Sequence, residues 1–312
     1  MLDHVLAILD LLDRPDASGA MVASHLRRFD ADLPIRVNTV AGDQGSTDFI
    51  SVTVPGQHGR HAGGNAPTLG VIGRHGGSGA RPSRIGYVSD GDGATATLAA
   101  SAKLVSMFAR GDRLEGDVIL STHVCPTAPT RQHEPVEFMS SPVGMDVMNE
   151  YELDSAMDAV ISIDTTKGNR IVNHRGIAIS PTVVQGWVLR VSEDAVAIYE
   201  RVCGVPASIL PITMQDITPY GNGVFHINSI LQPATATDAP VIGVAITAET
   251  AVAGSATGAS HEFDIALAAR YAVEWAKDFG RGRVSMFDRG EFDRLIRLYG
   301  DMRRLQTMGD EE

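Results

Sequence analysis

The sequence predicts an α/β fold of three layers, in which a mostly parallel or mixed sheet carries helices on both faces. Apolar segments typical of strands alternate along the chain with helical patterns, and this order is characteristic of such sheets. The apolar residues are mainly Ala, Val, Ile and Leu, and the chain contains 32 glycines, which favours layered helices and strands over a β-sandwich. With 312 residues, of which 44% are hydrophobic, the chain can bury one large core.

The N-terminal part is expected to form two helices followed by two strands. Leucine and valine residues at helical spacing predict a helix over residues 2–12. Ser18 is expected to cap a second helix that extends to Phe29. Apolar or alternating residues then predict strands over residues 35–40 and 49–54.

The rest of the chain alternates between short apolar segments and longer helical patterns. Strands are predicted over residues 69–72, 85–88, 118–121, 159–163 and 241–246. Helices are predicted over residues 94–109, 151–157, 193–203, 224–231 and 261–278. A hairpin is predicted through residues 170–179. Residues 1–280 are therefore expected to form a single catalytic-type α/β domain, and residues 281–312 a charged amphipathic helical tail that packs on it or contacts another copy.

The charge balance and the cysteine content limit the possible partners and location. A formal net charge of −12 argues against a nucleic-acid partner, which would require a basic patch. Two cysteines, Cys125 and Cys203, make a disulfide framework unlikely. The N-terminus lacks the basic region and cleavage site of a signal peptide, and no run of eighteen apolar residues occurs. We therefore expect a cytoplasmic protein without a membrane partner.

Histidine or acidic residues follow five of the predicted strands, where ligands bind in such sheets. The residues are His75, Asp90, Asp92, His123, Asp164, His261 and Glu262. Imidazole nitrogen and carboxylate oxygen are ligands of zinc, cobalt and manganese. The pattern therefore predicts a site for a divalent metal, with zinc as the first choice.

Structural roles are the alternative for the same residues. Asp90 and Asp92 could cap the helix that starts near residue 94. His261 could begin its own helix, where neighbouring acidic residues favour the helix dipole. Asp164 could cap a turn. The loop SDGDG fits neither phosphate-binding glycine motif, and no GxSxG motif of a serine hydrolase occurs.

Several segments resemble, in the same order, those of the co-catalytic zinc exopeptidases, the group of the deblocking, glutamyl and leucyl aminopeptidases. They are APTLGVIGRHGG, YVSDGDGATATLAASAKLV, MDAVISIDTTKG and GASHEFDIALAARYAVEWAK. The resemblance implies that fold and implies His75, Asp90 or Asp92, Asp164 and His261 as metal ligands. The segments SPTV, MQDITPYGNG, SILQPATATDAP and ATGASHE further identify the chain as a member of a prokaryotic family of unknown function, DUF1177.

Two departures from the exopeptidase pattern concern the chemistry. The resemblance implies an aspartate two residues after His75, where this chain has Gly77. It also implies a pair of glutamates after strand 118–121, where this chain has Thr122 and His123. His123 and Glu262 are therefore the residues that we expect to carry the proton.

Two functions remain open at this point. The first is a metal-dependent hydrolase of a peptide-like or amide small substrate, of the aminopeptidase or deacylase type. The residues predicted to contact its substrate are Asp216, Asn222, His226 and Asp238. The second, favoured by the missing glutamate pair, is a catalytically degenerate relative that binds a small metabolite without hydrolysing it. Related exopeptidases assemble into oligomers, which implies a homo-oligomer here.

Overall fold

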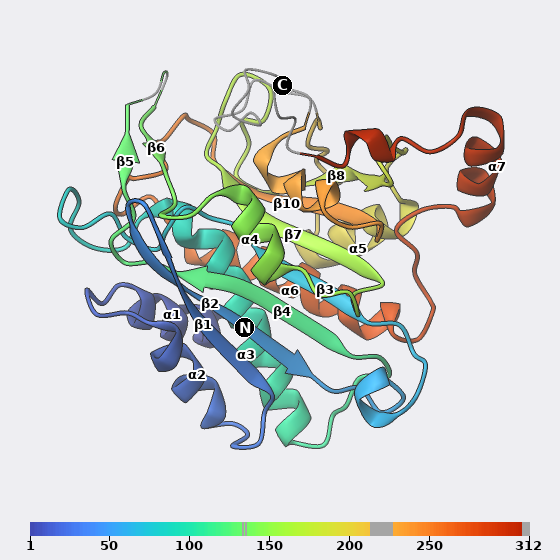
Figure 1. The fold of residues 1–312 in the computed structure, drawn as a ribbon, viewed down its shortest axis with the longest axis horizontal. Coiled ribbons are helices and arrows are strands. Elements are labelled where there is room, and N and C mark those ends of the chain that lie inside the picture. The colour runs from blue at the N-terminus through green and yellow to red at the C-terminus, as the bar shows by residue number, and fades with distance from the viewer. Residues whose placement is uncertain (133, 135, 213–226, 308–312) are drawn as a thin grey trace.

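A computed structural model describes residues 1–132, 134, 136–212 and 227–307, and the structural statements below concern these residues. Its centre is an eight-stranded sheet in the order β1-β2-β4-β3-β7-β10-β8-β9 (Figure 1). The strands are β1 (Ile35–Gly42), β2 (Gly45–Val54), β3 (Leu69–Gly73), β4 (Val118–Val124), β7 (Ala159–Thr166), β8 (Gly176–Val184), β9 (Trp187–Val188) and β10 (Val241–Thr247).

The four central strands, β4, β3, β7 and β10, run parallel to one another. Every residue of β3, β4 and β10 is buried, as expected for strands covered on both faces. The outer strands β1, β2, β8 and β9 pair antiparallel with their neighbours. The sheet is therefore mixed, and its parallel centre brings the carboxyl ends of β3, β4, β7 and β10 to one edge.

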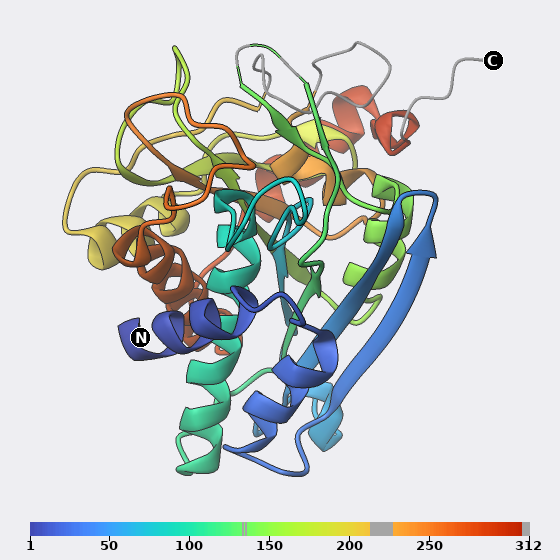
Figure 2. The ribbon, with the colours of Figure 1, turned by 90° about the vertical axis from the view of Figure 1, so that its left-hand side faces the viewer.

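Helices cover both faces of the sheet. One face carries α1 (Leu2–Leu12), α2 (Gly19–Arg27), α3 (Asp92–Ala109), α5 (Glu193–Cys203) and α6 (Glu262–Phe279), which share the largest hydrophobic core. The opposite face carries α4 (Met145–Glu152) and the 3-10 helix η3 (Ser229–Thr235). Figure 2 shows α4 and the helices α1 to α3 on opposite sides of the sheet.

The remaining elements are short and lie outside these layers. They are the 3-10 helices η1 (Arg60–Ala62), η2 (Ser89–Gly91) and η4 (Arg303–Leu305), the ribbon of β5 (Thr130–Arg131) and β6 (Phe138–Met139), and helix α7 (Arg289–Tyr299). Helix α7 stands at the margin of the molecule, beyond β9 and α5 (Figure 1). No helix in the described ranges is both long enough and apolar enough to cross a membrane.

The predicted fold class is confirmed, and most strands and helices lie where the apolar pattern placed them. Ser18 caps α2 as expected, since its side chain accepts a hydrogen bond from the backbone N–H of Met21. The strand predicted over residues 85–88 is wrong. Ile85 is 89% exposed, and Tyr87 and Val88 form only isolated bridges, to Gly79 and Thr257.

Three further predictions are corrected. The hairpin lies later than residues 170–179, because β8 and β9 are joined at Gln185 and Gly186, whose φ angles are 49° and 77°. The helix predicted over residues 151–157 is α4, which ends at Glu152. The helix predicted over residues 224–231 begins outside the described residues, and within its described part only residues 229–231 are helical, in the 3-10 helix η3.

Candidate functional site

A narrow cleft of about 70 Å³ lies at the carboxyl ends of β3 and β7. Much of its polar lining comes from the last residues of β7, from the segments that follow β3 and β7, and from η2, and most of its apolar lining comes from β6 and α4. The lining includes Arg74, His75, Asp90, Met139, Met145, Met148, Asp164 and Lys167. Three residues predicted from the strand-end pattern, His75, Asp90 and Asp164, therefore meet here.

His75 is buried against the ring of His123. The two rings are stacked, with centroids 4.0 Å apart and planes inclined by 17°. The Nε2 of His75 donates to the backbone oxygen of His123 over 2.6 Å, and its Nδ1 has no hydrogen-bond partner among the described residues. Burial, together with the nearby His123, holds the pKa of His75 well below its ordinary value, so that this imidazole is neutral.

His123 lies inside β4 rather than after it, because the strand continues to Val124. Its side chain is fully buried, and its Nδ1 lies 2.9 Å from Oε1 of Glu152. Glu152 also accepts a hydrogen bond from Arg74 over 2.7 Å, and both side chains are almost completely buried. His123 does not line the cleft. It is held in a buried Arg74–Glu152–His123 network, which does not suit its predicted role as a proton shuttle.

Asp90, rather than Asp92, points into the cleft. Its Oδ2 accepts hydrogen bonds from the backbone N–H groups of Gly76 and Gly77. Burial raises the pKa of Asp90 to about 7, although the two N–H groups act in the opposite direction. This carboxyl group can therefore donate or accept a proton near neutral pH.

Asp92 is the first residue of α3 and is completely buried. One carboxylate oxygen lies 2.6 Å from Nζ of Lys167, and the other accepts a hydrogen bond from the hydroxyl of Ser260. Burial raises the pKa of Asp92, whereas Lys167 and Ser260 lower it. Both oxygens of this carboxylate are thus bonded to side chains of the protein itself.

The other predicted residues are distributed more widely. Asp164 lines the cleft and accepts a hydrogen bond from the backbone N–H of Thr165. His261 is the N-cap of α6 and Glu262 its first residue; both are partly exposed, and neither lines the cleft.

Three of the predicted substrate-binding residues, Asp216, Asn222 and His226, lie outside the described residues. The fourth, Asp238, is exposed and precedes β10, at the opposite end of the sheet from the cleft. It forms hydrogen bonds of 2.8 to 3.1 Å with Arg303. The structure therefore does not bring Asp238 to the cleft.

Sequence reasoning missed Lys167, Arg74 and Glu152, although each takes part in the buried ionic contacts around the cleft. Arg74 directly precedes His75, and Lys167 lies three residues after Asp164. Both follow a predicted strand closely, so the strand-end rule could have found them if it had included cations. Glu152 comes from α4, and no local pattern distinguishes it from an ordinary helix carboxylate.

The described residues, as placed, do not fit a pair of divalent ions. An imidazole binds a metal in the plane of its ring, so that the stacked His75 and His123 cannot share one ion. The oxygens of Asp92 are already bonded to Lys167 and Ser260. Within the described ranges, no three His, Cys, Asp or Glu side chains are grouped in a way that could hold a metal.

The packing around Gly77 also differs from what the exopeptidase pattern requires. The exopeptidase resemblance implies an aspartate at this position. A Cβ atom added to Gly77 would lie 2.3 Å from Cβ of Ala128 and 2.9 Å from the backbone oxygen of Cys125. The local packing therefore leaves no space for any side chain, and none could reach a metal from here.

The fold places the chain in a class of α/β proteins that includes an enzyme of known structure. The chain is similar to the bottromycin maturation enzyme BotP, solved in complex with Mn, with a TM-score of 0.53 and 16% sequence identity over 88% of this chain and 70% of that one. At this identity the likeness concerns the fold. None of the curated proteins matches the chain. The family prediction is confirmed: the chain belongs to DUF1177, a family of proteins of unknown function whose model matches residues 38–309.

Proposed function

We propose that this chain binds a small amide- or peptide-like molecule in the cleft beyond β3 and β7, with Lys167 and Arg74 as built-in cations where a related enzyme would use metal ions. The contacts of Asp92 carry this proposal. Both of its oxygens are bonded, one to the ammonium group of Lys167 over 2.6 Å and one to Ser260. A buried carboxylate that is already neutralised in this way has no need of a metal ion.

The charge distribution favours recognition of a polar, hydrogen-bonding group. Lys167 and Arg74 form ion pairs with Asp92 and Glu152, which lie behind the cleft wall. Asp90 lines the cleft with a pKa of about 7. In its protonated form it can donate to an amide oxygen, and in its ionised form it can accept from an amide N–H or an ammonium group.

The size and apolar wall of the cleft limit what can be buried there. Ligand sites for whole drug-sized molecules typically have volumes of about 300–1,000 Å³, whereas this cleft has about 70 Å³. It therefore fits one functional group of a ligand, and the rest would extend outward. Phe138, Met139 and Met148 line the cleft and would contact the apolar part of that group.

A metal-dependent hydrolase of the aminopeptidase or deacylase type is the second candidate. The observation that favours it is the shared fold with an enzyme solved in complex with Mn. Zinc, manganese or cobalt would then have to compete with Lys167 for the carboxylate of Asp92. This candidate differs from the first in the metal content that it predicts for the purified protein and in its turnover of the substrate.

Growth in medium supplemented with zinc, manganese and cobalt, followed by elemental analysis, separates the two candidates. We expect a negligible metal content, whereas about two equivalents per chain, as in two-metal hydrolases, would favour the second candidate. The same preparation is then titrated calorimetrically with dipeptides and N-acyl amino acids, and hydrolysis is followed by mass spectrometry.

We expect binding of at least one of these compounds without turnover, and weaker binding by Asp90→Asn. Asp112→Asn, which changes an exposed carboxyl group away from the cleft, is the matched control and should bind as the wild type does. Equal binding by Asp90→Asn and the wild type would show that these compounds do not bind in the cleft. Metal-dependent turnover of any of these compounds would overturn the first candidate in favour of the second.

A further inference from the structure

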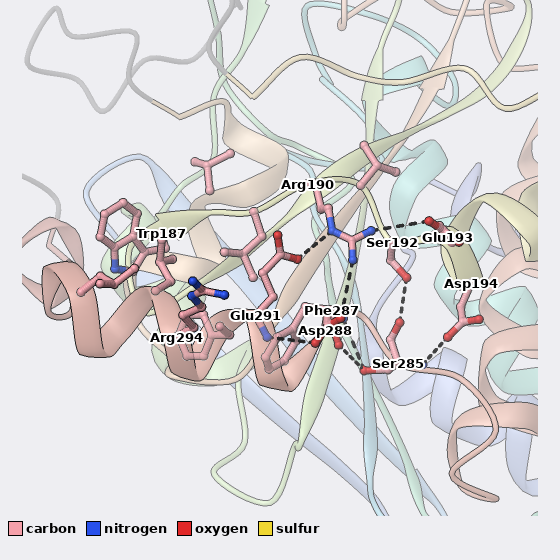
Figure 3. A pocket seen from close by; sticks show the side chains of 16 residues that line it. Trp187, Arg190, Ser192, Glu193, Asp194, Ser285, Phe287, Asp288, Glu291 and Arg294 are labelled. Atoms are coloured by element: carbon pink, nitrogen blue, oxygen red, sulfur yellow. Dashed lines mark hydrogen bonds and ion pairs between the residues drawn. The ribbon is translucent and has the colours of Figure 1, made fainter.

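A second cavity, of about 630 Å³, lies far from the cleft, between helix α7 and the segment that runs from β9 to the start of α5. Figure 3 shows Trp187, Arg190 and Glu193 on the side of that segment and Glu291 and Arg294 on α7. Its apolar lining includes Val188, Val191, Phe292, Leu295 and Leu298. We refer to this cavity as the α7 groove.

The apolar side chains around the α7 groove are incompletely covered. Of the eleven residues of α7, only Phe292 is buried. Leu298 is 62% exposed and Tyr299 is 69% exposed, and Val188 on the facing edge strand is 46% exposed. An amphipathic helix with so little of its apolar surface covered is typical of an interaction surface.

Charge is unevenly distributed along the α7 groove. Glu193, Asp194, Asp288 and Glu291 line it near the start of α7. Arg190 is the cation among them, and it pairs with Glu291, Glu193 and Asp288 at 2.7, 3.6 and 3.7 Å. This end is therefore acidic.

Arg294 lies further along α7 and also lines the groove. It forms no ion pair with any residue that the structure describes. The groove thus combines an acidic end, with more carboxylates than cations, and a guanidinium group that has no salt-bridge partner among the described residues. A helix with this charge distribution is complementary to a second copy of itself that runs in the opposite direction.

We propose that the occupant of the α7 groove is α7 of a second copy of this chain. An antiparallel approach about a two-fold axis would place Arg294 of each copy at the acidic end of the other groove. It would also cover Leu298 and Val188 with apolar side chains. Because the same surface serves both copies, the contact closes on itself and yields a dimer.

The size of the contact predicts its strength. Helix α7 has eleven residues and is about 16 Å long at 1.5 Å per residue. A contact centred on one such helix buries a surface area at the lower end of the range for protein interfaces, and complexes with such small interfaces dissociate readily. We therefore expect a dimer whose population depends on protein concentration in the micromolar range.

Sedimentation velocity of the full-length protein between about 1 and 200 μM, a range that brackets a micromolar Kd, tests this proposal. The wild type should shift from monomer to dimer across this range. Leu298→Asp should remain monomeric, because a carboxylate would be buried in the groove. Leu6→Asp, which changes a leucine that is 46% exposed on α1, is the matched control and should dimerise as the wild type does.

A charge reversal tests the orientation of the two helices. Arg294→Glu should raise the dissociation constant about tenfold or more, as expected when an interfacial charge pair becomes repulsive. Arg297→Glu changes an exposed arginine of the same helix that does not line the groove and should have a small effect.

A wild type that is monomeric at all concentrations would overturn the proposal. So would a dimer that survives Leu298→Asp, or one that Arg297→Glu weakens as much as Arg294→Glu does. These outcomes are independent of ligand binding in the cleft.

Discussion

The Nζ of Lys167 lies 2.6 Å from a carboxylate oxygen of Asp92, with both side chains almost completely buried. The two residues are 75 positions apart in the sequence, at the end of β7 and at the start of α3. A second buried pair, Arg74 and Glu152, lies in the same region. The protein therefore neutralises these two buried carboxylates with its own cations, and the following predictions test what this arrangement contributes.

Replacing Lys167 by methionine should destabilise the fold. The substitution keeps most of the side-chain volume but leaves the carboxylate of Asp92 buried without its cation. Removal of one partner of a buried ion pair typically costs about 3–5 kcal/mol, and we expect a loss in this range in the free energy of unfolding, measured with urea at pH 7.

The double variant Asp92→Asn with Lys167→Met should recover part of that loss, because no uncompensated charge then remains. Asp16→Asn, which breaks the exposed pair between Arg14 and Asp16, is the control and should leave the free energy of unfolding nearly unchanged, because solvent screens an exposed ion pair. If Lys167→Met proves as stable as the wild type, Lys167 does not neutralise Asp92.

Glu152→Gln should likewise be destabilising, by about 3–5 kcal/mol. The glutamine keeps the shape of the side chain but removes the negative charge that both Arg74 and His123 contact at 2.7 and 2.9 Å. Glu150→Gln changes an exposed carboxylate of the same helix and should be nearly neutral. Comparable losses in the two variants would show that the effect belongs to α4 in general and not to the buried network.

Asp90 should make the stability of the protein depend on pH. Its folded-state pKa of about 7 lies above the ordinary value of 3.8, so that the folded state binds the proton more tightly than the unfolded state. Burying Asp90 therefore costs least below pH 4, where the carboxyl group is protonated in both the folded and the unfolded state. The free energy of unfolding then falls as the pH rises from about 4 through 7.

The difference in unfolding free energy between Asp90→Asn and the wild type should therefore grow with pH. Between about pH 4 and 8 we expect an increase of roughly 2 kcal/mol, less than a fully buried group would give, because Asp90 is partly exposed. Chemical unfolding of both proteins across this range measures it. A difference that does not change with pH would contradict the raised pKa of Asp90.

Gly77→Ala should destabilise the protein because the added methyl group would lie 2.3 Å from Cβ of Ala128. Overpacking of this kind typically costs about 1–3 kcal/mol, and Ala128→Gly in the same chain should relieve part of it. Gly290→Ala is the control, since its Cβ would meet only an oxygen of Asp288 at 3.4 Å. If Gly77→Ala and the control have similar melting temperatures in thermal unfolding, the site has room for a side chain.

Much of the fold could be predicted because its elements have local causes. Helix α1 and strand β10 begin and end within a residue or two of the predicted limits, since their apolar periodicity reflects burial along a single segment. The wrong strand prediction at residues 85–88 also comes from reading the local apolar pattern alone. Three apolar side chains in four positions resemble a strand, but Ile85 points to solvent and no strand pairs with this segment.

The site was predictable only in part. The strand-end rule found His75, Asp90 and Asp164 because parallel strands bring their carboxyl ends to one edge. It could not choose between Asp90 and Asp92, since that choice depends on how η2 and the start of α3 pack. It also placed His123 after the end of its strand, although β4 extends three residues beyond the predicted limit at residue 121.

The sequence by itself determined the α/β class, the family, and the set of histidines and carboxylates available at the strand ends, because these depend on composition, periodicity and local order. Only the tertiary structure decided how their charges are neutralised. Lys167 meets Asp92 and Arg74 meets Glu152 across 75 and 78 residues. Contacts over such separations arise from the packing of β3, β7, α3 and α4 around one edge of the sheet, and no local pattern encodes them.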